Sequence, residues 1–237
     1  EFSRLASAAG NHRIIRFGTS ETAQARLLDA TSDAEGVAVS MTLAGVPLRF
    51  RLSAPGTHMA INAVGAIAAA VAMGMEPHHA SAALDGFAAV SGRGARRRLH
   101  VAGGEALLLD ESYNASGPSV RAALAVLALQ PATRRIAVLG DMRELGEASA
   151  AEHQGLAPDV IAHADLLFAC GPEMRRLYDA VPEAKRAAHT ATSAELAPLV
   201  AAALLPGDAV LVKGSLGSRM AMVINALPVR AETEEPA

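Results

Sequence analysis

The sequence of 237 residues predicts an α/β protein whose larger part is a mostly parallel, doubly wound sheet. From residue 105 onward, short apolar runs alternate with helical patterns, which is typical of strand–helix–strand units with right-handed crossovers. These runs are rich in Leu and Val and lack polar alternation, as expected for strands covered on both faces. Before residue 90 the pattern differs, because it contains a predicted hairpin and a long apolar helix. We therefore expect two regions of different architecture.

The first region is predicted to open with a short helix and a strand over residues 13–17. Two alternating runs, residues 36–43 and 46–52, are separated by an Ala-Gly turn and predict a hairpin. The most hydrophobic stretch, residues 59–75, is shorter than the roughly 20 residues of a membrane span. We expect it to be a buried helix, followed by a second helix after Pro77, whose fixed φ suits a first helical turn.

The second region is predicted to alternate strands and helices in a regular order. Strands are expected over residues 106–110, 135–140, 166–170, 188–191 and 209–213, and helices over 119–130, 149–163, 173–180, 194–204 and 218–227. A Gly- and Arg-rich run at Ser91–Arg98 separates the two regions and predicts a domain boundary. The predicted division is residues 1–93, residues 94–230 and an acidic tail at 231–237.

Composition excludes several classes of function. A net charge of -3 argues against a general nucleic-acid-binding protein, which needs a basic face. The single cysteine, Cys170, excludes a disulfide framework and a multi-cysteine zinc site, and it fits a reducing cytosol. The lysines are Lys185 and Lys213, and neither follows the glycine that a Gly-Lys-Ser/Thr phosphate-binding loop requires. We expect a cytoplasmic protein with no membrane segment and no phosphate-binding loop of that type in this chain.

Polar residues follow three of the predicted parallel strands, at the edge where ligands bind in open sheets. Asp110, Tyr113 and Asn114 follow the first, and Asp110 is placed to accept a hydrogen bond from a ribose hydroxyl. A helix cap followed by a turn explains the same residues equally well. Lys213 ends an apolar strand before Gly-Ser, so that its ammonium and the amides around Ser215 form a small anion site. The alternative is a lysine that extends past a turn into solvent.

The strand at 135–140 leads into Gly140-Asp-Met-Arg-Glu-Leu-Gly, with His153 on the helix that follows. Gly140 permits close backbone approach, and Asp141, Arg143 and Glu144 concentrate charge beyond the strand. We interpret this charge as a candidate substrate site. A solvated loop with internal ion pairs is the alternative interpretation.

His58 and Asn62 lie four residues apart, on one face at the start of the long helix. One imidazole and one amide make a poor metal site, so no metal site is predicted here. An amide within an Ala- and Val-rich helix needs hydrogen-bond partners if it is buried, and an adenine edge offers a donor beside an acceptor. An Asn satisfied within the core explains the pattern equally well.

Taken together, these stretches resemble the Mur ligase family, and they cover nearly the whole chain in order and spacing. The residues that carry the resemblance are Gly56-Thr-His-Met-Ala-Ile-Asn62, Gly92-Arg93, Asp110-Glu-Ser-Tyr-Asn-Ala115 with Ser119, Val138-Leu-Gly-Asp-Met-Arg-Glu-Leu-Gly146 with His153, and Val212-Lys-Gly-Ser215. The family pattern usually continues Tyr-Asn-Ala with Asn-Pro, whereas Ser116-Gly-Pro118 follows here. That departure weakens a direct role for Ser116 but not for Asp110 or Asn114.

The resemblance implies the end of a central ATP-binding domain followed by a Rossmann-like C-terminal domain. It points to the member that joins D-Ala-D-Ala to UDP-N-acetylmuramoyl-tripeptide through an acyl phosphate, with ATP and Mg²⁺. The family's phosphate-binding loop, most of its magnesium ligands and its UDP-sugar domain precede the part that matches, so the resemblance implies that this chain alone is an inactive fragment. A monomer acting on small molecules is expected.

The resemblance also implies a role for each candidate residue. Asn62, with His58 beside it, would meet the adenine, and Asp110 would hold the ribose, with Tyr113 and Asn114 nearby. Arg93 would approach the γ-phosphate. The D-Ala-D-Ala side would be lined by Asp141, Arg143, Glu144, Lys213 and Ser215. Lys213 and Arg93 are thus the catalytic candidates.

Three alternatives remain open at this point. A sister ligase that adds a diamino acid is disfavoured because the sequence has no Asp-Asn-Pro-Arg run. Folylpolyglutamate synthase is a second related enzyme. A nucleotide- or amino-acid-binding module without catalytic activity belongs to a different class, and residues 95–237 alone would be enough to form one.

Overall fold

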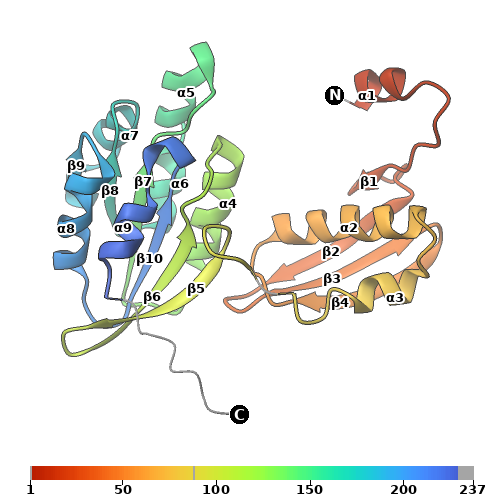
Figure 1. Ribbon diagram of the computed structural model, residues 1–237, viewed down its shortest axis with the longest axis horizontal. Coiled ribbons are helices and arrows are strands. Elements are labelled where there is room, and N and C mark those ends of the chain that lie inside the picture. The colour runs from red at the N-terminus through yellow and green to blue at the C-terminus, as the bar shows by residue number, and fades with distance from the viewer. Residues whose placement is uncertain (1, 88, 229–237) are drawn as a thin grey trace. The chain divides into compact units, whose positions relative to one another are not determined.

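The computed structural model describes residues 2–87 and 89–228, with the side chain of Phe2 left undescribed (Figure 1). The chain divides into two compact units, residues 1–87 and 88–237. The Gly- and Arg-rich run at 91–98 therefore belongs to the second unit. The acidic tail predicted at 231–237 lies outside the described residues.

The first unit is a small sheet covered by helices. Its elements are α1 (Phe2–Ala9), β1 (Phe17–Gly18), β2 (Ala25–Ser32), β3 (Val37–Leu43), β4 (Val46–Leu52), α2 (Thr57–Ala72) and α3 (Pro77–Ala82). The strand order is β1-β2-β3-β4, with β1 parallel to β2 and the other pairs antiparallel. The predicted hairpin is confirmed: Ala44 and Gly45 both take positive φ, of 49° and 87°, as a tight hairpin turn requires.

The buried face of α2 explains its composition. Ala60, Ala63, Val64, Ile67 and Ala68 recur at helical spacing, are all buried, and pack against the inward side chains of β2, β3 and β4. Alternating burial along β3 shows the strand period that the sequence predicted for this hairpin.

Two details of the first unit differ from the prediction. The strand expected over 13–17 is reduced to the two residues of β1. The strand β2 was not predicted, because its pairing with β3 shifts register between Leu27 and Asp29. Such an irregularity interrupts the period of two from which a strand is recognised in sequence.

The second unit is built on a six-stranded sheet of order β5-β6-β10-β7-β8-β9. Its strands are β5 (Ala95–Val101), β6 (Gly104–Glu111), β7 (Arg134–Gly140), β8 (Leu166–Cys170), β9 (Arg186–Thr190) and β10 (Asp208–Lys213). All neighbours are parallel except β5 and β6, which form a hairpin. The mostly parallel sheet is thus confirmed. The edge strand β5 was not predicted: its Arg96-Arg97-Arg98 reads as a linker in sequence, although charged residues are typical of a sheet edge.

Helices cover both faces of this sheet (Figure 1). They are α4 (Gly117–Ala128), α5 (Ser149–Gln154), α6 (Ala157–His163), α7 (Met174–Ala180), α8 (Ser193–Ala203) and α9 (Ala221–Ala226), with short 3-10 turns at Gly146–Ala148, Glu183–Lys185 and Leu216–Ser218. Alternate residues of β7 enter separate cores: Ala137 and Leu139 pack with α4, α6 and α7, whereas Ile136 and Val138 pack with α8 and α9. A strand buried on both faces has no polar alternation, which explains the pattern seen in the sequence.

The single helix predicted over 149–163 is two helices, α5 and α6. Pro158 occupies the first turn of α6. Proline lacks the N–H that a continuing helix would need, so it begins a helix rather than extending one. Within the described residues, no helix combines the length and the apolar character needed to cross a membrane.

Candidate functional site

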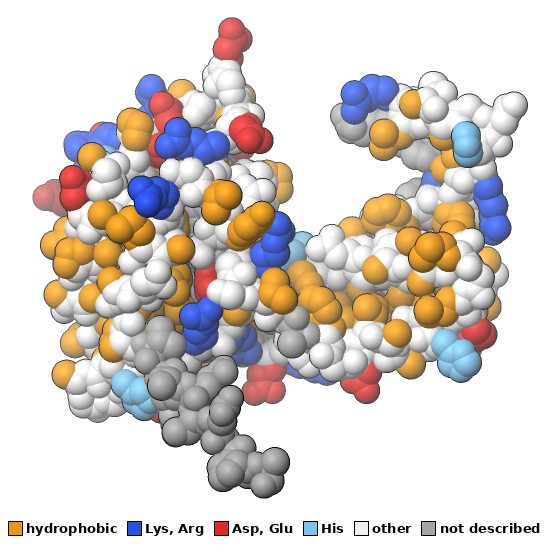
Figure 2. Space-filling model, in the orientation of Figure 1, with side chains coloured by type: hydrophobic (Ala, Val, Ile, Leu, Met, Phe, Trp, Pro, Cys, Tyr) orange, Lys and Arg blue, Asp and Glu red, His pale blue; other side chains and the backbone are white. Residues whose placement is uncertain are grey.

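The predicted site residues of the second unit meet at the carboxyl ends of three adjacent strands, β6, β10 and β7. The central strand β10 places Lys213 in register with Glu111 of β6 and with Leu139 of β7. Acidic and basic side chains lie close to one another over this end of the unit (Figure 2). The sheet order therefore brings together polar segments that are about 100 residues apart in sequence, as the hydrogen bond from Lys213 to Asn114 illustrates.

Lys213 is held by internal partners. Its side chain is 3% exposed, and its Nζ lies 3.2 Å from Oε2 of Glu111 and donates to the carbonyl oxygen of Asn114 at 2.9 Å. The ammonium thus ties the end of β10 to the loop that precedes α4. Glu111 was not among the predicted site residues, and its pairing with Lys213 follows only from the order of the strands.

Ser215 connects the loop after β10 to the loop after β7. Its backbone N–H donates to the carbonyl oxygen of Asp141 at 3.1 Å, and its Oγ accepts the N–H of Arg143 at 2.9 Å. Ser218 adds a hydrogen bond from its Oγ to the same Asp141 carbonyl at 2.8 Å. Asp141, Arg143 and Ser215 were predicted to line a ligand site, and in the structure their hydrogen bonds hold the two loops together.

Among the charged side chains of the loop after β7, one is buried and two are exposed. Asp141 is 3% exposed, and its Oδ1 accepts the N–H of Met174 at the start of α7, at 2.9 Å. Arg143 and Glu144 are exposed. Glu144 has a φ of 65°, a left-handed conformation that residues other than glycine seldom adopt. Such conformations are held by their surroundings and are concentrated at functional sites.

A hollow of about 310 Å³ opens beside this loop, at the carboxyl ends of β7, β8 and β9. Asp141, Arg143 and Arg219 supply its charges, and its apolar wall includes Pro172 and Met222. No hydrogen bond or ion pair to another described residue holds the guanidinium of Arg143 or Arg219. A hollow with two arginines beside a carboxylate suits a small ligand that carries both a negative and a positive charge.

Sequence reasoning assigned no role to Arg219. It follows the Lys-Gly-Ser stretch and has a φ of 54°. Its carbonyl oxygen accepts hydrogen bonds from Ser193 Oγ at 3.0 Å and from the N–H of Met222 at 2.9 Å. These bonds hold the backbone in its left-handed conformation, which no sequence pattern indicated.

At the end of β6, the carboxylate of Asp110 is buried and hydrogen-bonded to neighbouring side chains. It is 1% exposed; its Oδ1 accepts from Ser112 Oγ at 2.7 Å, and its Oδ2 accepts from Ser91 Oγ at 3.0 Å. Arg97 lies 3.5 Å from the same Oδ2 and donates to Ser91 at 2.6 Å. A ribose hydroxyl that approached Asp110 would have to displace the Ser91 contact.

Arg93 and Tyr113 form a pair above this network. The guanidinium carbon of Arg93 lies 4.2 Å from the centre of the Tyr113 ring, a cation–π distance, and both side chains are exposed. Gly92 has a φ of 78°, and a Cβ there would meet the Cβ of Tyr113 at 3.0 Å, so glycine is needed for this close approach. Asn114 is exposed, with its Oδ1 accepting the N–H of Ala115 at 2.9 Å.

In the first unit, Asn62 is exposed and His58 is half-buried on α2. The interpretation of Asn62 as an amide satisfied within the core is therefore wrong: it faces away from the sheet, because the buried stripe of α2 runs through Ala60, Ala63 and Ile67. A mostly apolar hollow of about 240 Å³ lies beside Asn62, lined also by Met59, Leu84 and Phe87 among others.

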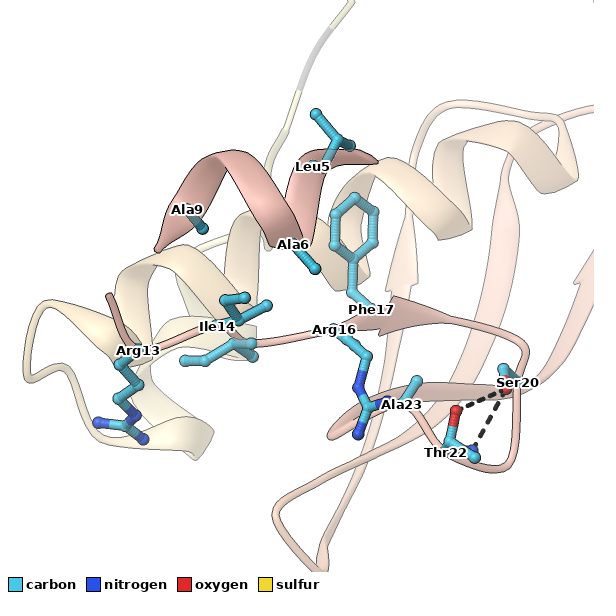
Figure 3. A pocket seen from close by; sticks show the side chains of 11 residues that line it. Leu5, Ala6, Ala9, Arg13, Ile14, Arg16, Phe17, Ser20, Thr22 and Ala23 are labelled. Carbon is cyan, nitrogen blue, oxygen red and sulfur yellow. Dashed lines mark hydrogen bonds between the residues drawn. The ribbon is translucent and has the colours of Figure 1, made fainter. Parts of the chain in front are cut away.

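A larger hollow of about 680 Å³ in the same unit contains none of the predicted site residues. It lies between α1 and the segment that leads into β1, with Leu5, Ala6 and the ring of Phe17 on its apolar side (Figure 3). Ser20 and Thr22 are hydrogen-bonded to each other at its far end (Figure 3). Its walls are mostly apolar, and Arg13 and Arg16 also line it.

A metal site is not evident in the described part of the chain. No group of three His, Cys, Asp or Glu side chains is close enough there to hold a metal ion. At the sheet edge, Glu111 pairs with Lys213, Asp110 accepts from Ser112, and Oδ1 of Asp141 accepts from the start of α7.

Cys170, at the end of β8, lines the hollow of about 310 Å³ beside Asp141, but it is only 1% exposed. Burial, reinforced by the negative charge of Asp141, raises the pKa of this thiol to about 12. Because the thiolate is the reactive form, we expect Ellman's reagent at about pH 8 to leave Cys170 unmodified in the native chain and to modify it in guanidinium chloride. Rapid reaction of the folded protein would contradict the burial that we describe.

Comparison with known proteins agrees with this arrangement. The family described as "Mur ligase, glutamate ligase domain" matches residues 97–216. The UDP-N-acetylmuramoyl-tripeptide–D-alanyl-D-alanine ligase of Synechocystis sp. is 33% identical over 79% of this chain and 40% of its own length. The UDP-N-acetylmuramate–L-alanine ligase of Clavibacter michiganensis is 41% identical over 41% of this chain and 20% of its own.

The fold is shared with solved structures of the same kind. MurF of Acinetobacter baumannii superimposes with a TM-score of 0.78 and 26% identity, over 94% of this chain and 48% of that one. This chain thus spans less than half the length of each of these three relatives. Since the family match covers 120 residues, from 97 to 216, which is more than half of the 237, the chain belongs to the Mur ligase family.

Proposed function

We propose that this chain is part of an ATP-dependent ligase that adds D-Ala-D-Ala to UDP-N-acetylmuramoyl-tripeptide during peptidoglycan precursor synthesis. The observation that carries the proposal is the hollow at the ends of β7, β8 and β9, where Arg143 and Arg219 lie beside Asp141 and no other described residue binds either guanidinium. D-Ala-D-Ala is a zwitterion with two methyl side chains. The arginines suit its carboxylate, Asp141 suits its amino end, and Pro172 and Met222 suit its methyl groups.

In the proposed reaction, the tripeptide carboxylate becomes an acyl phosphate at the expense of ATP, because a free carboxylate is a poor electrophile. The ammonium of the dipeptide loses a proton, and the resulting amine attacks the acyl carbon. Phosphate then leaves, and the nitrogen gives up a second proton as the amide forms. The second unit contributes by holding the dipeptide so that its amine meets the acyl phosphate in one orientation. Glu144 and Ser215 lie on the same edge, and Lys213 acts through the loop that it ties to β10.

The nucleotide contacts form a separate part of the proposal. Asn62, with His58 near it, is proposed to meet the adenine in the small apolar hollow of the first unit. Arg93 and Tyr113 are exposed and suit the phosphates and the ribose, with Asn114 nearby. Asp110 would reach the ribose only if its bond with Ser91 opened. The described residues do not fit a Mg²⁺ site, and we assign no step to the metal. We place the reaction in the cytoplasm and expect a monomer.

Calorimetry on the 237-residue chain tests the dipeptide site. D-Ala-D-Ala is expected to bind to the wild type, and Arg143→Ala to weaken its affinity on the order of tenfold, because a charge-assisted hydrogen bond to the dipeptide carboxylate is lost. Arg98→Ala is the matched control, since Arg98 is an exposed arginine on the edge strand β5 that pairs with Glu105. Equal affinities for the wild type and Arg143→Ala would remove Arg143 from the site.

The same titrations distinguish D-Ala-D-Ala from the substrate of a related ligase. The similarity to an L-alanine ligase gives this second candidate its support. Titration with L-alanine and with meso-diaminopimelate, beside D-Ala-D-Ala, ranks the three. Tighter binding of L-alanine, with the same dependence on Arg143, would replace the proposed substrate while leaving the site in place.

A further inference from the structure

The imidazole of His153 is wholly buried on α5 and has two backbone partners. Its Nε2 lies 2.9 Å from the backbone nitrogen of Met142, which can only donate, so Nε2 accepts and carries no proton. Its Nδ1 lies 2.7 Å from the carbonyl oxygen of Ser149, which can only accept, so Nδ1 carries the proton. These partners define a neutral ring with one tautomer.

The group that Nε2 holds lies in the middle of the candidate site. Met142 is flanked by Asp141, whose carboxylate accepts from α7, and by Arg143, whose N–H donates to Ser215. Glu144 follows with its left-handed φ of 65°. The turn is therefore attached on three sides. Among the hydrogen bonds described for its backbone N–H groups, the bond from Met142 to His153 is the one that joins the turn to α5.

We propose that His153 is a positioning residue, which as the neutral Nδ1–H tautomer fixes the turn Asp141–Glu144 and so directs Arg143 toward the hollow. A ring that served only to fill the core would need neither a particular tautomer nor a nitrogen facing Met142. A ring protonated on both nitrogens would place one N–H against another at Met142. The part of this inference that concerns the dipeptide rests on the proposed function, whereas the conformation of the turn does not.

Nuclear magnetic resonance on the full 237-residue chain measures both features. Nitrogen-15 shifts of the ring are expected to show Nδ1 protonated and Nε2 unprotonated. In His153→Phe, which keeps a ring but removes both nitrogens, the Met142 amide loses its acceptor. Its hydrogen exchange is expected to accelerate on the order of tenfold or more, while the amides of Val210 and Val212 in β10 keep their rates.

A second variant separates the bond from the shape of the ring. The Oε1 of His153→Gln can accept the Met142 N–H, so this variant is expected to restore much of the slow exchange. The opposite tautomer or an imidazolium signature in the wild type would overturn the proposal, and that measurement stands even if the Phe variant does not fold. Unchanged Met142 exchange in His153→Phe, or equal acceleration at Val210 and Val212, would overturn it as well, since the ring would then be a core filler.

Dipeptide titration completes the test. His153→Phe is expected to weaken D-Ala-D-Ala binding to the level of Arg143→Ala, and His153→Gln to recover most of the affinity. Full affinity in His153→Phe, with the Met142 amide freed, would show that the turn does not govern the site and would overturn the inference. If the wild type binds no dipeptide although Met142 exchange behaves as expected, the proposed function fails and the conformational role of His153 stands.

Discussion

Replacing Arg134 by methionine is expected to lower the free energy of unfolding by about 3–5 kcal/mol, because it leaves a buried carboxylate without its cation. Arg134 and Asp208 begin the adjacent strands β7 and β10 in register. The guanidinium forms two bonds to the carboxylate, Nε to Oδ1 at 2.9 Å and Nη2 to Oδ2 at 2.6 Å. The Asp208 side chain is fully buried, and this pairing holds the pKa of Arg134 above its usual range.

Urea unfolding followed by circular dichroism measures this effect. Arg98→Met is the control, because the Arg98–Glu105 pair is solvent-exposed and its loss should cost less than about 1 kcal/mol. The double variant Arg134→Met/Asp208→Asn should recover part of the loss, since it removes the unpaired charge, although Asp208 Oδ2 also accepts the N–H of Leu205 at 2.8 Å. Equal costs for Arg134→Met and Arg98→Met would contradict the burial of this pair.

Because of the position of this pair, the effect of Arg134→Met on stability can be measured separately from any effect on dipeptide binding. Arg134 and Asp208 lie at the amino ends of their strands, whereas the candidate site lies at the carboxyl ends. Arg134→Met that remains folded is therefore expected to bind D-Ala-D-Ala as the wild type does. A loss of affinity for D-Ala-D-Ala in folded Arg134→Met, measured without denaturant, would indicate that the two ends of the sheet are coupled.

The sequence predicted the strand ends of the site well, and the reason is physical. An apolar run that stops at Gly-Asp or at Lys-Gly-Ser marks the end of a buried strand, and parallel strands all end on one side of the sheet. Which strands are neighbours is a different matter. The pairing of Lys213 with Glu111 depends on β10 lying between β6 and β7, and the apolar pattern of a strand does not show which strands are its neighbours.

The residues that sequence reasoning missed share a dependence on tertiary context. Arg219 takes its left-handed φ because Ser193 and Met222 bind its carbonyl oxygen, and Ser193 belongs to a different helix. The strand β5 consists of charged residues that become a sheet edge only because β6 is there to pair with. Asn62 was predicted as a site residue, but its exposure was not, because alanine occupies the outer face of α2 as well as the inner one.

The substitution Lys213→Met is expected to reduce both stability and dipeptide affinity, and to do so through the loop that Lys213 holds. The change keeps most of the apolar stem in its buried position but removes the ammonium that binds Glu111 and the Asn114 carbonyl. Losing a hydrogen-bonded charge of this kind costs about 2 kcal/mol. The loop before α4 then loses its bond to β10, so the edge of the site is expected to loosen and the affinity for D-Ala-D-Ala to fall.

A double-mutant cycle decides whether Lys213 acts through Glu111 or touches the ligand itself. If the ammonium works through its internal partners, Lys213→Met and Glu111→Gln together should cost clearly less than the sum of the single changes, both in urea unfolding and in calorimetry. If the ammonium binds the dipeptide carboxylate directly, Lys213→Met should abolish binding with little loss of stability, and Glu111→Gln should leave binding intact.

The 3% exposure of Lys213 and its two internal bonds favour the first result, because an ammonium already enclosed by protein has to break those bonds before it can meet a ligand. The exposed guanidinium groups of Arg143 and Arg219 face no such barrier, and for that reason we expect them, rather than Lys213, to meet the dipeptide carboxylate.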